Sequence, residues 1–280
     1  MLKQRVLTAL VVAGLLLAAV FTLSPESLAL VFALVVLLAA WEWAALSGLK
    51  SLVSRGAYLI FIALTVAATA RYCGLYGNPA SATAIRDVLV FVCTWWALAL
   101  LWVLSYPGSA MVWGSRLARG LIGVPVLIGP WLGLVWLRDQ FHGEWLLIYL
   151  VLIVCSNDIA AYFSGRAWGG RKLLPSVSPG KTWAGLYGGI AGSMMCAVLF
   201  GLHAGFSAKM LFAWVVVAAI ATVGSILGDL VESMVKRHRG VKDSGRLLPG
   251  HGGILDRIDS ITAAAPIFAL AAIVSGVLPL

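Results

Sequence analysis

Residues 210–231 read MLFAWVVVAAIATVGSILGDLV, and this stretch decides the class of the fold. A helix needs about 20 apolar residues to cross the hydrocarbon core of a bilayer, and this run is long enough. Its charged residue is Asp229, close to the carboxyl end of the run. We therefore predict a transmembrane helix that carries a carboxylate near the membrane boundary.

The whole chain has the composition of such segments. Of its 280 residues, 61% are hydrophobic and 11% are charged, and the mean hydropathy is +0.99. Soluble domains are about half apolar and about a quarter charged. The composition therefore excludes a soluble globule, a disordered chain and a nucleic-acid-binding domain, despite the net charge of +9. The four cysteines lie far apart, so we expect neither a disulfide framework nor a zinc site.

Apolar runs of this kind predict an all-α, polytopic integral membrane protein with about nine transmembrane helices. The third run, with fourteen residues, is the shortest of them. The sixth run contains Asp158, just as the eighth contains Asp229. The nine expected spans lie near residues 6–23, 28–47, 57–70, 88–104, 120–137, 145–164, 183–202, 210–231 and 258–279.

The distribution of Lys and Arg predicts the orientation, because short cytoplasmic loops are enriched in these residues. With the amino terminus inside, 16 of the 20 Lys and Arg residues fall on the cytoplasmic side. The predicted topology is therefore N-in and C-out. The cytoplasmic segments are residues 1–5, 48–56, 105–119, 165–182 and 232–257.

Two of these cytoplasmic loops carry most of the charge that the chain has. We predict an N-terminal transmembrane region of about five helices (1–140) and a C-terminal catalytic region of about four (141–280), with the loops 165–182 and 232–257. A loop that only contacts anionic lipid would avoid carboxylates. The second loop and its flanks nevertheless hold five of the eleven acidic residues. This mixture of acids and bases predicts a metal and phosphate site.

The first loop contains Ser178-Pro179-Gly180-Lys181-Thr182. Ser178 and Pro179 are typical of a helix start, with Ser as the N-cap and Pro in the first helical position. The positive end of a helix favours an anion, so we expect Lys181 and this helix start to hold a phosphate. A Walker A loop is disfavoured, because Pro175 stands where that motif needs Gly. A basic connector that merely caps a helix is the alternative.

Asp158 also has two interpretations. A carboxylate inside a membrane span is costly and is usually functional. Alternatively, its place near the cytoplasmic end of the sixth span would allow it to be hydrated or paired with Arg166.

The second loop brings several ionisable residues into helical register. Asp229, Glu232, Ser233 and Lys236 have the spacing i, i+3, i+4 and i+7, which places them on one helix face. Asp256 and Asp259 would lie on the first turn of the last helix. Carboxylates from two helices with bases nearby suit Mg²⁺ that carries a nucleoside triphosphate. A salt-bridged re-entrant loop is the alternative.

Two further residues are interpreted from their neighbours. His251 stands among Gly250, Gly252 and Gly253, which indicates backbone packed closely around a ligand rather than a metal-binding trio. Glu42, between two tryptophans, is interpreted as an interfacial residue without a functional role.

The residues quoted so far resemble a known family. Residues 233–259 read S-x-x-K-R-x₄-K-D-x-G-x₂-L-P-x-H-G-G-x-x-D-R-x-D, which is similar to the signature of phosphatidate cytidylyltransferases, also called CDP-diacylglycerol synthases. The segments D-x-x-A-Y-x-x-G from Asp158 and S-P-x-K-T-x-x-G from Ser178 also resemble that family. The resemblance is dense over residues 155–260 and weak over the first 120. One departure is Ala184, where many members carry Glu or Gln.

The resemblance implies a Mg²⁺-dependent transfer of CMP from CTP to phosphatidic acid, for phospholipid biosynthesis. It implies that Asp229, Lys236 and Asp256 are catalytic. The metal ligands would be Asp229, Asp256 and Asp259, with a second cation beside the Mg²⁺. The expected substrate-binding residues are Ser178, Lys181, Thr182, Ser233, Arg237, Lys242, Asp243, His251 and Arg257.

The expected partners are CTP, phosphatidic acid and bilayer lipid, with no nucleic acid, and the resemblance also implies a homodimer. The expected location is the cell inner membrane, with the active site at the cytoplasmic face. The rival functions are a cytidylyltransferase or CTP-dependent kinase for another lipid, and a transporter that uses Asp158 and Asp229 as an ion path. A transporter would be expected to show inverted repeats and charges near the midplane, whereas the sequence shows no repeat and most of its charges lie at the expected cytoplasmic face.

Overall fold

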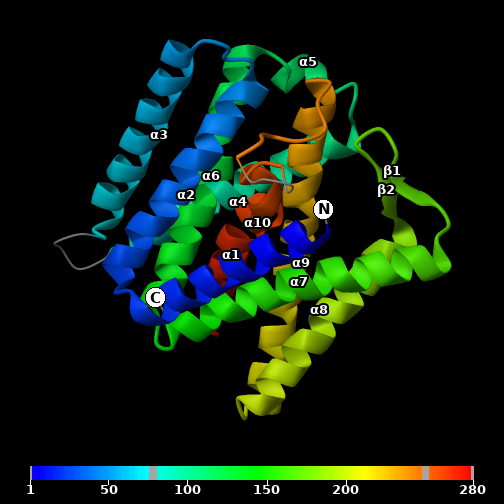
Figure 1. The fold of residues 1–280 in the computed structure, drawn as a ribbon. Coiled ribbons are helices and arrows are strands. Elements are labelled where there is room, and N and C mark those ends of the chain that lie inside the picture. The colour runs from blue at the N-terminus through cyan, green and yellow to red at the C-terminus, as the bar shows by residue number, and fades with distance from the viewer. Residues whose placement is uncertain (1, 76–80, 248–251, 279–280) are drawn as a thin grey trace.

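The computed structural model describes residues 2–75, 81–247 and 252–278, and within them the chain is almost entirely helical (Figure 1). The expectation of an all-α fold is confirmed, apart from one small hairpin. In chain order, the elements are α1 (Leu2–Thr22), α2 (Pro25–Ser47), α3 (Leu52–Cys73), α4 (Ala82–Leu104), α5 (Ala110–Trp113), α6 (Arg116–Asp139), α7 (Gly143–Trp168), β1 (Lys172–Leu174), β2 (Ser178–Thr182), α8 (Trp183–His203), α9 (Ala208–His238) and α10 (Leu255–Val274).

Eight of the described helices are long and apolar enough to cross a membrane, which makes this a multi-pass membrane protein. They correspond to the second to ninth expected spans. The third span is a full 22-residue helix, longer than its apolar run indicated, because polar residues at both ends continue the helix. In α1, the apolar segment found is the shorter stretch Ala13–Thr22. The count of nine spans and the N-in orientation therefore stay predictions.

Serine residues mark where many of the helices begin. Ser24, Ser51, Ser81, Ser115 and Ser207 each have extended backbone, and each hydroxyl oxygen accepts a hydrogen bond from the backbone N–H three residues later. This bond satisfies one of the N–H groups that a helix start leaves without a partner. These local signals set the helix boundaries before any tertiary packing is considered.

The core of the bundle forms where α6 and α10 pack together, with α2, α4 and α9 around them (Figure 1). Gly133 of α6 lies against the backbone of Ala265, and Gly228 of α9 lies against the carbonyl of Asp259. Small residues at such contacts let membrane helices approach closely, which strengthens van der Waals packing. The domain boundary expected near residue 140 stays a prediction, since helices from both sides of it share this core.

The basic segments expected to be cytoplasmic gather at one end of the bundle. In Figure 1 the α2–α3 connection, α5 and the carboxyl end of α9 lie together at the top, opposite the α8–α9 connection. Four hydrogen bonds join these segments, namely Arg119–Ser47 (3.1 Å), His238–Gly114 (3.3 Å), Arg237–Val177 (3.4 Å) and Ser176–Tyr106 (3.3 Å). Four of the five segments thus share a face, as the orientation argument requires.

The expected helix start at Ser178 is wrong. Residues 178–182 form β2, which pairs antiparallel with β1, with Leu174 opposite Ser178 and Lys172 opposite Thr182. Helix α8 starts at Trp183, and Thr182 is its N-cap, accepting a hydrogen bond from the N–H of Gly185 at 3.1 Å. Ser178 and Thr182 both have hydroxyl groups that could cap a helix. The pairing of β2 with β1 keeps residues 178–182 extended, so that the helix begins only after Thr182.

Gly228 provides a test of the α9–α10 contact. Replacing it with alanine would put a Cβ into the backbone carbonyl of Asp259, and such overpacking costs about 1–3 kcal/mol. We expect Gly228→Ala to lower the thermal unfolding temperature of the detergent-solubilised protein. Gly56→Ala, where the added Cβ meets open space in α3, is the control. Equal unfolding temperatures for the two variants would contradict the close contact.

The orientation can be tested with a reporter fused after Leu280. The N-in topology with nine spans predicts that this reporter lies outside the cytoplasm. The measurement is alkaline phosphatase activity, which needs export, compared with fluorescence of a cytoplasmic reporter at the same position. A cytoplasmic signal would overturn either the count of nine or the N-in orientation.

Candidate active site

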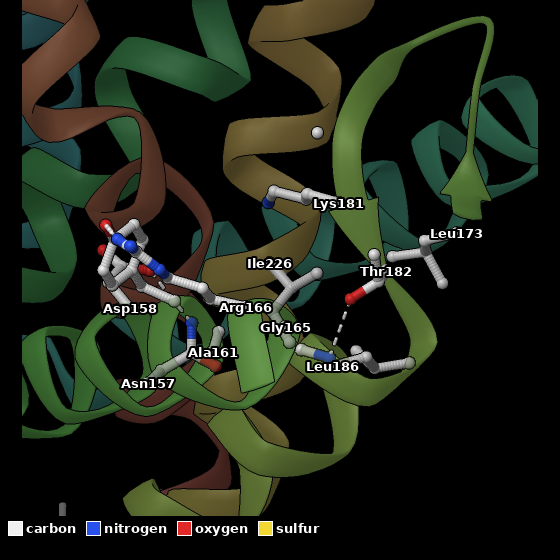
Figure 2. Close-up of a pocket in the computed structure, with 13 residues that line it drawn as sticks. Asn157, Asp158, Ala161, Gly165, Arg166, Leu173, Lys181, Thr182, Leu186 and Ile226 are labelled. Atoms are coloured by element: carbon white, nitrogen blue, oxygen red, sulfur yellow. Dashed lines mark hydrogen bonds between the residues drawn. The ribbon is translucent and has the colours of Figure 1, made fainter. Parts of the chain in front are cut away.

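A cavity of about 410 Å³ lies between α7, the β1–β2 hairpin, α8 and α9 (Figure 2). Its lining includes the charged side chains of Asp158 and Lys181 and the apolar side chains of Leu186 and Ile226. A cavity with both kinds of side chain can take an amphipathic molecule. The lining residues are Asn157, Asp158, Ala161, Tyr162, Gly165, Arg166, Leu173, Gly180, Lys181, Thr182, Gly185, Leu186 and Ile226.

An ion pair beside this cavity joins the first loop to α9. The Nζ of Lys181, on β2, lies 2.6 Å from Oδ2 of Asp229. The other carboxylate oxygen of Asp229 accepts a hydrogen bond from the hydroxyl of Ser233, one helical turn later, at 3.1 Å. Lys181 and Asp229 are each about 30% exposed, so a ligand can reach both. The two loops therefore meet at this pair.

A second ion-pair cluster lies deeper, between α9 and α10. The Nζ of Lys236 is 2.7 Å from Oδ1 of Asp256 and 3.1 Å from Oε1 of Glu232. The side chains of Glu232, Asp256 and Lys236 are 3%, 8% and 11% exposed, respectively. One lysine thus contacts two buried carboxylates.

Backbone donors hold Asp256 in place. Its Oδ2 accepts hydrogen bonds from the N–H groups of Ser244, at 2.9 Å, and Gly253, at 2.8 Å. Asp259, one turn further along α10, lies at the close contact between α10 and Gly228 of α9. The expected approach of the carboxylates at the ends of α9 and α10 is therefore present.

The other expected binding residues differ in where they lie. Arg237 is exposed, and its Nε donates to the carbonyl of Val177 in the first loop, at 3.4 Å. Lys242, Asp243 and Arg257 are exposed. Ser178 is half-buried in β2, outside the residues that line the cavity. His251 lies outside the described residues.

The alternative pairing of Asp158 with Arg166 is not among the ion pairs of the described residues. Arg166 instead donates a hydrogen bond to the hydroxyl of Tyr162 at 3.1 Å. Asp158 accepts one from the side-chain amide of Asn157 at 3.1 Å. Asp158 also faces the same cavity as Lys181, which places it near the charged groups of the candidate site.

The carboxylates suit a hard cation in kind, because Mg²⁺ prefers oxygen ligands. Glu232 is buried, and its Oε2 has no hydrogen-bond partner in the part of the chain that the structure describes. Within those same residues, however, no three acidic, His or Cys side chains converge as a metal-binding group. Two of the three expected metal ligands, Asp229 and Asp256, are instead paired with Lys181 and Lys236.

Glu42 is the residue that sequence reasoning missed. Its side chain is 2% exposed, so the interpretation as an interfacial residue is wrong. Its carboxylate accepts hydrogen bonds from the hydroxyl of Ser244 at 3.0 Å and from the backbone N–H groups of Ile254 and Leu255 at 3.1 and 2.8 Å. A carboxylate within an apolar run was the available signal, and its two tryptophan neighbours suggested an interface instead.

The cluster around Lys236 gives a stability prediction. Lys236→Met would leave Glu232 and Asp256 buried without their cation, and breaking such a buried pair costs about 3–5 kcal/mol. We expect a clear fall in the thermal unfolding temperature. Lys172→Met, at an exposed position on β1, is the matched control and should unfold like the wild type. An unchanged unfolding temperature in Lys236→Met would contradict a persistent buried cluster.

Comparison with known proteins shows which family the chain belongs to. The model of the cytidylyltransferase family matches residues 3–274. A phosphatidate cytidylyltransferase of Pseudomonas aeruginosa is 45% identical over 269 residues, which cover 96% of each chain. One from Haemophilus influenzae is 42% identical over 288 residues, covering 96% of this chain and 97% of the relative. One from Bacillus subtilis is 44% identical over 128 residues, covering 46% of this chain and 47% of the relative. The resemblance noted in the sequence is confirmed, and the chain belongs to the cytidylyltransferase family.

Proposed function

We propose that the protein is a phosphatidate cytidylyltransferase, which makes CDP-diacylglycerol and pyrophosphate from CTP and phosphatidic acid. The full-length relatives with that printed name support the proposal. The observation that carries it is the Lys181–Asp229 pair, where two polar loops meet beside a cavity between apolar helices. A water-soluble nucleotide and a membrane lipid can both reach such a place.

The reaction needs charge neutralisation more than base catalysis. A phosphate oxygen of phosphatidic acid attacks the α-phosphorus of CTP, and the bond from that phosphorus to the bridging oxygen of the β-phosphate breaks. Pyrophosphate carries away the electron pair, so no external oxidant or acceptor is required. The attacking phosphate is already an anion. The barrier therefore lies in bringing two anions together and stabilising the leaving group.

Lys181 and Lys236 supply positive charge at the two ends of this site. Lys181 lines the cavity, which suits contact with the phosphate of the lipid. Lys236 is buried among carboxylates, whereas Arg237 and Lys242 are exposed and would be accessible to an incoming triphosphate. Ser178, Thr182, Ser233, Asp243, His251 and Arg257 complete the proposed substrate contacts.

We further propose that Asp229 and Asp256 hold Mg²⁺ on the CTP phosphates, with Asp259 as an auxiliary ligand and a second cation nearby. When bound, the metal would neutralise the phosphate charge that builds up on the leaving group. For this, Lys181 and Lys236 must release their carboxylates. The incoming phosphates would then take the place of those carboxylates as partners of the two lysines.

The lipid would enter from the bilayer. Leu186, Ile226 and Tyr162 line the cavity beside exposed apolar helix surface, so acyl chains can stay in the membrane while the headgroup reaches Lys181. The proposed location is the inner membrane, with the site at the cytoplasmic face, and the homodimer also stays a prediction. A transporter is disfavoured, because the sequence shows no inverted repeat of the kind expected for many transporters.

The direct test is an assay of the purified full-length protein with labelled CTP, phosphatidic acid and Mg²⁺. We expect CDP-diacylglycerol and pyrophosphate in equal amounts. Removing Mg²⁺ with a chelator should stop the reaction, and restoring it should return the activity. Absence of product from intact protein, with turnover of another lipid phosphate, would move the assignment to that acceptor.

The roles of the two aspartates are tested in the same assay. Asp229→Asn and Asp256→Asn each remove a carboxylate charge with little change in shape. We expect kcat to fall at least about 100-fold in each, at normal protein levels in the membrane. Asp87→Asn, an exposed carboxylate on α4 paired only loosely with Arg86 at 3.9 Å, is the control. Near-normal turnover in either site variant would overturn its role.

A further inference from the structure

Glu42 lies in α2, in the first half of the chain, yet each hydrogen bond that it accepts from the described residues comes from the second loop, 232–257. Its side chain is 2% exposed, and the donors are Ser244, Ile254 and Leu255, more than 200 residues away in sequence. A buried carboxylate is costly unless hydrogen bonds compensate for the lost water. These three bonds supply that compensation, so the carboxylate and the loop depend on each other.

The bonds from Ile254 and Leu255 also complete the start of α10. Ile254 is the N-cap residue of this helix, and its apolar side chain makes no capping hydrogen bond. The first N–H groups of a helix need acceptors, and the positive end of the helix dipole favours a negative charge beside them. Glu42, which belongs to α2, provides the hydrogen-bond acceptors and the negative charge at the start of α10. It therefore fixes where and in which direction α10 begins.

Two glycines show how closely the loop follows this carboxylate. A Cβ added at Gly245 or at Gly253 would overlap the Glu42 side chain. Gly245 precedes the part of the loop outside the described residues, and Gly253 follows it. The backbone on both sides of the loop is thus packed against one carboxylate, at a distance that only glycine permits.

The same two backbone segments hold Asp256. Ser244 donates its hydroxyl to Glu42 and its N–H to Asp256, while Gly253 donates its N–H to Asp256 and Ile254 donates to Glu42. The two carboxylates therefore share one backbone scaffold. A change in the position of Glu42 would alter the donors that orient Asp256, although the two side chains belong to different helices.

The amino-terminal end of the loop also rests on the first half of the chain. Arg119 of α6 donates to the carbonyls of Ser47, at the end of α2, and Gly114. The carbonyl of Gly114 in turn contacts Nε2 of His238, the last residue of α9, at 3.3 Å. Residues from the first half thus hold both ends of the loop between α9 and α10.

We propose that Glu42 is a positioning residue for cytidylyl transfer, which acts as a clamp by holding residues 244–245 and 253–255 so that Asp256 faces the site. This inference rests on the proposed function. The clamp also gives the N-terminal helices a direct part in building the active site. Their contribution is then a specific carboxylate and not only apolar surface.

The test compares Glu42→Gln with Glu26→Gln, an exposed glutamate at the opposite end of the same helix. Gln keeps the shape but loses the charge, and its amide nitrogen cannot accept a hydrogen bond. We expect kcat to fall about 100-fold in Glu42→Gln, in line with displaced catalytic groups. The Mg²⁺ concentration for half-maximal activity should rise. A mere loss of folded enzyme would lower the rate without moving that concentration, and Glu26→Gln should change neither.

A second readout needs no activity. In metal-free protein, trypsin should cleave after Lys242 and Arg246 about tenfold faster in Glu42→Gln than in Glu26→Gln. The reason is that weaker hydrogen bonds to residue 42 let the backbone near these sites open more often. Fragment masses report the sites. Unchanged cleavage together with unchanged kcat would overturn the proposal. Faster cleavage with an inactive wild type would support the clamp and overturn only the proposed function.

Ser244→Ala keeps the test decisive if Glu42→Gln fails to fold. This substitution removes the hydroxyl, which is one of the three donors to Glu42. It keeps the backbone N–H of residue 244, which donates a hydrogen bond to Asp256. We expect smaller changes in the same directions, with faster cleavage after Lys242 and a raised Mg²⁺ requirement. A Ser244→Ala protein identical to wild type in both readouts would count against the clamp.

Discussion

Charged side chains are costly to bury at the boundary of an apolar helical bundle. This cost controls how the ionisable residues of the C-terminal half are arranged. An ionised carboxylate near the ends of α9 and α10 is costly when it is buried without a partner. Lys181 therefore reaches Asp229 from β2, and Lys236 lies between Glu232 and Asp256. These pairs bring the hairpin, α9 and α10 to one place. Lys181 and Lys236 also make this site suitable for phosphates, because an incoming phosphate can replace a carboxylate as the ion-pair partner of a lysine.

A second buried carboxylate connects the halves of the chain. Glu42 accepts hydrogen bonds from the backbone N–H groups of Ile254 and Leu255, at the start of α10, and from the hydroxyl of Ser244. The catalytic loop consequently rests on α2, although its recognisable motifs all lie in the second half of the sequence. The N-terminal helices can therefore contribute hydrogen bonds to this loop as well as apolar surface.

Much of the fold could be predicted from local patterns, because apolar run length and serine N-caps act within one turn or one span. Eight expected spans are present as long apolar helices. The helix start at Ser178 was mispredicted because Ser-Pro and Thr182 are both adequate local signals. Pairing of β2 with β1 decides between them. The pairing of Asp158 with Arg166 was likewise compatible with helical spacing, yet Arg166 bonds Tyr162 instead.

The sequence by itself determined that this is a helical membrane protein of the cytidylyltransferase family, because hydropathy and a continuous motif need no long-range information. It also placed Asp229 and Lys236 on one helix face, since that follows from helical periodicity. Only the tertiary structure decided which charges pair across elements and which groups contact Glu42. A hydrogen bond between residues 42 and 254 depends on how α2 packs against the start of α10, and no local pattern encodes that contact.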